Sequence, residues 1–168
     1  SDVGYRLVIV LAGTINILRA QTQRRIDKEL IGKELLDYDS IYIENPPEDW
    51  DDFKAGSYSS DGNIPKISGG EFIVGKFEDT LPVFFSESRP IASVINYDAD
   101  LYSSTICALN FSKQVIDKDT ILIFDEFIIN ESWEQDEFKA LNEFCSINNY
   151  SYEVIALSFI TKQVAVKL

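Results

Sequence analysis

Short apolar runs that alternate with segments of helical spacing constrain the fold of this chain more than any other feature. PIASVINY (90–97) and TILIFDEF (120–127) are two such runs. Strands that are apolar along almost their whole length are typical of a parallel sheet buried on both faces. The segments that follow them, 101–115 and 133–147, have the spacing of helices. The sequence therefore predicts an α/β fold with a mostly parallel sheet and helices on both faces.

Seven segments are predicted to be strands: 5–13, 40–44, 71–75, 90–97, 120–127, 151–158 and 163–168. Further helices are predicted over 14–31 and, interrupted at Pro82, over 77–85. Because only Phe159 to Lys162 separate the last two strands, these strands must form an antiparallel hairpin, which adds one antiparallel edge strand to six parallel ones. The 168 residues suit one domain, predicted over 1–168.

Composition excludes several classes of function. The formal net charge of -13 repels phosphate backbones and anionic lipids, so no nucleic acid and no membrane partner is expected. The absence of His excludes Ser-His and Cys-His catalysis and every His-ligated metal site. Cys107 and Cys145 lack partner spacing and are expected to be reduced, buried thiols. No apolar run approaches the roughly 20 residues of a membrane span, and a cytoplasmic location is expected.

Paired acids close the two long apolar runs. Asp98 and Asp100 follow the first run, and Asp125 and Glu126 follow the second. In open α/β sheets the ligand site lies beyond the carboxyl ends of the strands. If the two strands are neighbours, their axes lie about 4.8 Å apart, and these carboxylates suit a hard cation such as Mg²⁺. The alternative is that the acids only begin loops and cap helices, with Asp100 as an N-cap.

An ordered set of blocks carries a family resemblance. The blocks are GKFEDTLPVFF, YDADLYSST, ILIFDEF, WEQDEFKALNEF and QVAVKL, preceded by PPEDWDDFKAGSY. Over about residues 46–168 they resemble the macrocin O-methyltransferase (TylF-type) family, a branch of the class I methyltransferases that use S-adenosylmethionine. The resemblance implies a Rossmann-like fold and methyl transfer to a hydroxyl of a sugar or natural-product-like small molecule. It also implies that Mg²⁺ is held by Asp98, Asp125 and Glu126, with Asp98 as proton acceptor.

The N-terminal 35 residues depart from that family. The turn after the first strand holds one glycine, Gly13, and no acid, and VIVLAGTINILRAQTQRRID resembles a piece of a Z1 domain. The residues predicted to bind the cofactor are Gly13, Glu44, Asp98 and Tyr102. Two functions therefore stay open: an O-methyltransferase with an atypical cofactor motif, and an inactive methyltransferase-like domain that serves as a binding or assembly module. Besides the small-molecule substrate, the partner considered is a second copy of this chain in a homo-oligomer.

Overall fold

The computed structural model describes residues 8–12, 73–129 and 131–168. Contacts divide the chain into one compact unit of residues 1–11 and 73–168 and a second of residues 12–72, of which only Ala12 is described. The expected strand at 40–44, the helix at 14–31, Gly13 and Glu44 lie outside the described residues. The prediction of a single domain over 1–168 stays a prediction.

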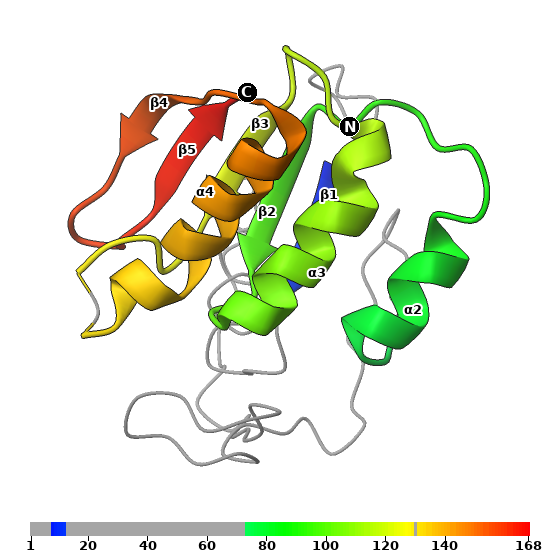
Figure 1. Ribbon diagram of the computed structural model, residues 1–168, viewed down its shortest axis with the longest axis horizontal. Coiled ribbons are helices and arrows are strands. Elements are labelled where there is room, and N and C mark those ends of the chain that lie inside the picture. Colours follow the sequence, from blue (N-terminus) through cyan, green and yellow to red (C-terminus); the bar gives the residue numbers. More distant parts are fainter. Residues whose placement is uncertain (1–7, 13–72, 130) are drawn as a thin grey trace, which may run out of the picture. The chain divides into compact units, whose positions relative to one another are not determined.

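The described part of the chain is an α/β fold with a mixed sheet (Figure 1). The strands are β1 (Val8–Ala12), β2 (Val94–Asp98), β3 (Ile121–Phe124), β4 (Glu153–Leu157) and β5 (Val164–Lys167). The helices are α2 (Phe77–Phe84), α3 (Tyr102–Ser112) and α4 (Glu137–Asn148), with short 3₁₀ turns over Lys113–Val115 and Trp133–Gln135. None of these helices has the length and apolar character needed to cross a membrane.

The order of the strands across the sheet is β1-β2-β3-β5-β4. β2 and β3 are parallel, whereas β5 is antiparallel to both β3 and β4. The predicted hairpin of the last two strands is therefore confirmed. The prediction that the antiparallel strand lies at the edge of the sheet was wrong. Among the described strands, the antiparallel strand β5 lies between β3 and β4, and β4 is at the edge. The count of seven strands stays a prediction, since five are described.

Two other local predictions were wrong. Ile73, Val74 and Gly75, which belong to the predicted strand at 71–75, are exposed and form no strand. The α2 helix continues through Pro82 to Phe84 instead of being interrupted there. Pro82 lacks only one backbone donor, and so short a helix has few intrahelical bonds for it to remove.

Helices α3 and α4 lie side by side across one face of the sheet, and α2 contacts α3 (Figure 1). Alternate residues of β2, β3 and β5 are fully buried, as a sheet covered by helices requires. The Tyr97 hydroxyl and the Ser112 hydroxyl are 2.7 Å apart, which ties β2 to α3. Helices on the other face of the sheet stay a prediction. Both cysteines are free thiols, Cys145 buried and Cys107 half-buried.

Candidate functional site

The acids after β2 and β3 meet at one rim of the sheet. Tyr97 of β2 is paired with Phe124 of β3, and the Asp125 N–H donates to the Tyr97 carbonyl at 3.1 Å. The next residues, Asp98 and Asp125, are therefore neighbours, and both side chains are buried. The predicted adjacency of the two strands is confirmed. It follows from the parallel pairing, which brings both carboxyl ends to the same edge.

Asp100 turns back into the rim. It has a left-handed φ of 56°, and the Leu101 N–H donates to the Ala99 carbonyl at 2.6 Å across it. The side chain is 0 % exposed, and within the described residues neither carboxylate oxygen has a hydrogen-bond partner. The alternative that Asp100 caps a helix was wrong, because α3 begins at Tyr102 after Leu101 with no side-chain cap. A buried acid without partners calls for a ligand or a proton.

Glu137, in the first turn of α4, completes the acidic rim. It is 0 % exposed, and its Oε2 accepts a hydrogen bond from the Glu126 N–H at 3.1 Å. Glu137 was not among the predicted site residues, although one feature of the sequence points to it. Glu137 stands three, four and seven residues before Ala140, Leu141 and Phe144, which are fully buried. An acid on the apolar face of an amphipathic helix is unusual and marks a special environment.

Burial and mutual repulsion shift the titration of two of these acids. Burial raises the pKa of Asp100 well above its usual range, and the nearby Asp98 and Glu137 carboxyls raise it further. Burial likewise raises the pKa of Glu137, with Asp125 and Asp98 adding to the effect and the backbone N–H groups of Glu126 and Ala99 opposing it. Desolvation disfavours the charged form of a carboxyl, and so does a neighbouring negative charge. Both acids therefore keep their protons to a higher pH than in the unfolded chain.

The raised pKa of Asp100 makes stability depend on pH. The folded state binds the proton more tightly than the unfolded state, so the stabilisation is present below about pH 4, the ordinary carboxyl pKa, and is lost as pH rises toward the raised pKa. We expect the free energy of unfolding to fall less steeply with pH in Asp100→Asn than in wild type, by up to about 1.4 kcal/mol per pH unit. Asn also tolerates the left-handed φ. Urea unfolding at a series of pH values from 5 to 8 measures the difference.

A matched control for this prediction is Asp119→Asn. The Asp119 side chain is 70 % exposed and pairs with Lys118 at 3.1 Å. The Asp119→Asn variant should therefore keep the pH dependence of stability seen in wild type, because an exposed ion pair contributes little to stability. Equal slopes of unfolding free energy against pH in wild type and Asp100→Asn would contradict the prediction.

The turn between β4 and β5 supplies partners to the acids after β3. Lys162 Nζ lies 2.8 Å from Glu126 Oε2, and the Gln163 side-chain amide donates to Asp125 Oδ1. Among the described residues no group of three or more acidic or cysteine side chains is arranged to hold a metal ion. The residues predicted as Mg²⁺ ligands are thus at one rim, but the two after β3 are engaged by side chains of the hairpin. The described donor set does not fit a bound Mg²⁺ in this arrangement.

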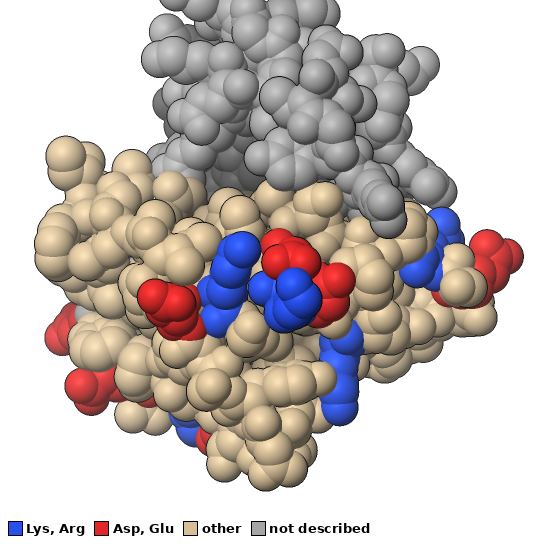
Figure 2. Space-filling model, turned by 90° about the horizontal axis from the view of Figure 1, so that it is seen from above, with Lys and Arg blue, Asp and Glu red and all other residues tan. Residues whose placement is uncertain are grey.

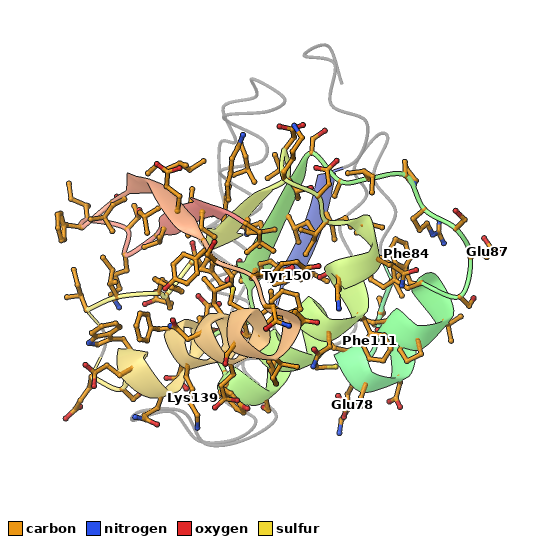
Figure 3. All side chains as sticks on the ribbon, turned by 45° about the horizontal axis from the view of Figure 1, so that its top comes forward. Glu78, Phe84, Glu87, Phe111, Lys139 and Tyr150 are labelled. Atoms are coloured by element: carbon orange, nitrogen blue, oxygen red, sulfur yellow. The ribbon has the colours of Figure 1, made fainter. Side chains whose placement is uncertain are left out.

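Tyr102, predicted to contact the cofactor, is held by α4. Its hydroxyl donates to Glu143 Oε2 at 2.6 Å. Lys139, labelled in Figure 3, projects from the same helix, and its Nζ lies 4.5 Å from the centre of the Tyr102 ring. These contacts explain how α3 and α4 pack at their ends. A role of Tyr102 toward a cofactor stays a prediction.

The acidic rim contrasts with the exposed charges of the described chain. On the face seen in Figure 2, acidic and basic side chains lie next to one another. Lys76 and Glu78, 3.5 Å apart, are one exposed pair of opposite charge. The charges on that face form no patch of one sign, whereas four acids, Asp98, Asp100, Asp125 and Glu137, are buried at the rim.

This chain has only limited similarity to the known proteins with which it was compared. No family profile and no curated protein matches this chain. The structure of the O-methyltransferase NovP has 22 % sequence identity and a TM-score of 0.45, over 55 % of this chain and 35 % of that one. Apo CalS11, described as a TDP-rhamnose 3'-O-methyltransferase of calicheamicin biosynthesis, has 21 % identity and a TM-score of 0.45, over 56 % and 40 %. The chain thus spans less than half the length of either protein.

Proposed function

We propose that this chain transfers a methyl group from S-adenosylmethionine to a hydroxyl of a small molecule, a sugar or natural-product-like compound. The observation that carries the proposal is the meeting of Asp98 and Asp125 at the carboxyl ends of two parallel strands, with Asp100 and Glu137 buried beside them. Ligands of open α/β sheets bind at such ends. The blocks of sequence that resemble the macrocin O-methyltransferase family include both strand ends.

The acids of the rim suit a cationic cofactor. Asp100 presents two buried oxygens, and Glu137 one, that have no hydrogen-bond partner among the described residues. A positive charge near such oxygens is favourable, because it offsets their mutual repulsion and their loss of water. S-adenosylmethionine, when bound, supplies an electrophilic methyl group on a positively charged sulfur. Gly13, Glu44 and Tyr102 stay predictions for cofactor binding, and Gly13 and Glu44 lie outside the described residues.

Asp98 is the residue that we assign to proton transfer. It is almost fully buried at the end of β2, next to Asp125. A carboxylate in this place would accept the proton that the acceptor hydroxyl loses when it receives the methyl group. The products are then a methyl ether, a neutral thioether and a protonated Asp98. Positioning of the two reactants contributes the rest of the acceleration.

The magnesium part of the prediction has less support. A Mg²⁺ ion at Asp98, Asp125 and Glu126 would require Lys162 and Gln163 to leave two of its ligands. No step of the proposed reaction is therefore assigned to a metal. The expected cytoplasmic location and the homo-oligomer stay predictions.

The second candidate is a binding or assembly module that has lost cofactor binding. Two hydrogen bonds favour this candidate. The Tyr102 hydroxyl donates to Glu143, and the Gln163 side-chain amide donates to the Asp125 carboxylate. Such a module would keep the strand order and the acidic rim but bind no S-adenosylmethionine.

Calorimetric titration with S-adenosylmethionine, with and without Mg²⁺, separates the two candidates. We expect saturable binding at one site in both cases, because the acidic rim favours a sulfonium without a metal. Asp119→Asn should bind equally well, since that acid is exposed and belongs to the turn before β3. Absence of heat in both titrations would support the module and contradict the transferase. Binding that needs Mg²⁺ would restore the metal to the mechanism.

A further inference from the structure

The hairpin turn between β4 and β5 is built to hold two side chains against the acids that follow β3. The Ser158 N–H donates to the Gln163 carbonyl at 2.9 Å, which closes the turn. Inside it the Thr161 hydroxyl lies 2.7 Å from Ser158 Oγ and 3.1 Å from Gln163 Oε1. Because the amide oxygen of Gln163 is thus held by Thr161, its amide nitrogen is oriented toward Asp125, to which it donates.

Lys162 is fixed in the same turn. Its backbone has a left-handed φ of 58°, a conformation that residues other than glycine adopt rarely and that is kept only where the surroundings enforce it. Its Nζ forms an ion pair of 2.8 Å with Glu126 Oε2. The side chains of Lys162 and Glu126 are 37 % and 14 % exposed. A pair that is partly withdrawn from water is screened less than the pairs of the open surface.

From this geometry we infer that the ammonium group of Lys162 takes the place of a divalent cation beside the acids after β3, while Gln163 positions Asp125. Lys162 neutralises Glu126, and the Gln163 amide satisfies one oxygen of Asp125 without adding charge. The rim then needs no metal ion to fold or to hold its acids in place. Lys162 and Gln163 are positioning residues here, because neither is shown to touch a reactant.

This inference rests on the proposed function for its catalytic meaning, since it makes the methyl transfer independent of a metal. Its test needs neither S-adenosylmethionine nor an acceptor. Failure of the transferase proposal and failure of the inference are therefore distinguishable. The test asks only whether Lys162 keeps Mg²⁺ away from these acids in the wild type.

Mg²⁺ is titrated calorimetrically into wild type, Lys162→Met, Lys162→Arg and the double variant Lys162→Met/Glu126→Gln. Lys118→Met is the matched control, because it removes the same charge from an exposed lysine that pairs with Asp119. We expect no saturable heat in wild type, Lys162→Arg and Lys118→Met up to about 10 mM, tenfold above the weakest natural calcium sites at about 1 mM. Lys162→Met should bind Mg²⁺ at least about tenfold more tightly than wild type, the factor that corresponds to one charge-assisted hydrogen bond. The double variant should lose that binding.

The inference is overturned if wild type binds Mg²⁺ at one site that Asp125→Asn abolishes, or if Lys162→Met binds no more tightly than wild type. A second measurement avoids variants that fail to fold. Acylation of lysines at pH 8, followed by mass spectrometry of the wild type, should label Lys162 more slowly than Lys118 at any Mg²⁺ concentration. Faster labelling of Lys162 when Mg²⁺ is added would show that the ion displaces it, and would overturn the inference.

Discussion

Replacing Phe124 by alanine is expected to lower the free energy of unfolding by about 3 to 5 kcal/mol. The Phe124 ring is fully buried and stacks on Tyr97, with centroids 4.9 Å apart and planes 11° apart. It also contacts the Phe127 ring, whose centroid is 5.2 Å away. Truncation therefore removes buried apolar area and leaves a cavity beside the Tyr97 and Phe127 rings. Urea unfolding followed by circular dichroism gives the value.

Phe159→Ala is the matched control for that measurement. Phe159 is 71 % exposed in the turn after β4, so its loss should change the free energy of unfolding by no more than about 0.5 kcal/mol. Phe124→Leu, which keeps most of the buried volume, should cost much less than Phe124→Ala. Equal destabilisation by Phe124→Ala and Phe159→Ala would contradict the assignment of Phe124 to the core.

The aromatic stack has a consequence for the rim. Tyr97 and Phe124 are paired in register, and each directly precedes one of the acids, Asp98 or Asp125. The same contact that stabilises the sheet thus sets the relative position of the two carboxylates. Loss of the stack should therefore weaken any ligand binding at the rim, as well as stability.

The neighbouring strands and the hairpin could be predicted because short-range patterns determine them. Continuous apolar runs identify β2 and β3, and the short connection of Phe159 to Lys162 leaves no room for a crossover. The place of β5 between β3 and β4 could not be predicted in this way. It depends on which strand edges remain free once the helices have packed, and connection length does not encode that.

The side chains that complete the rim come from distant parts of the chain, and they were missed for that reason. Glu137 reaches the Glu126 N–H from α4, and Lys162 reaches the Glu126 side chain from the turn between β4 and β5. The one sequence signal for Glu137 is its place on the apolar face of a predicted helix, and Lys162 has the appearance of an ordinary turn lysine. Prediction from the acids alone therefore favoured a metal, because a lysine near them in space was not near them in sequence.

Two predictions based on the local conformational preferences of residues were wrong. The apolar pair Ile73 and Val74 has the composition of a strand, yet both side chains are exposed. β-propensity reflects packing on a sheet, and without a neighbouring strand it decides little. Pro82 reads as a helix breaker, but α2 has only 8 residues and tolerates it.

Asp98→Asn is expected to lower kcat for methyl transfer by about 100-fold to 10,000-fold, the range for loss of a general base, with little change in KM. Asn keeps the size of the side chain but cannot accept the hydroxyl proton. Steady-state assays that follow the demethylated cofactor, on variants whose circular dichroism matches wild type, measure the effect. Asp119→Asn, which changes an exposed acid in the turn before β3, at the opposite end of that strand from Asp125, should keep the wild-type rate.

Asp125→Asn decides between the two forms of the mechanism. The Asn carbonyl oxygen can still accept the Gln163 amide, so a site that uses Lys162 in place of a metal should lose less than about tenfold in kcat, the equivalent of one hydrogen bond. A site that holds Mg²⁺ through Asp125 should lose activity as severely as Asp98→Asn, because a ligand carboxylate is gone. Full activity in Asp98→Asn itself would remove the proton-transfer role from this acid, and with it the reason for placing the reaction at this rim.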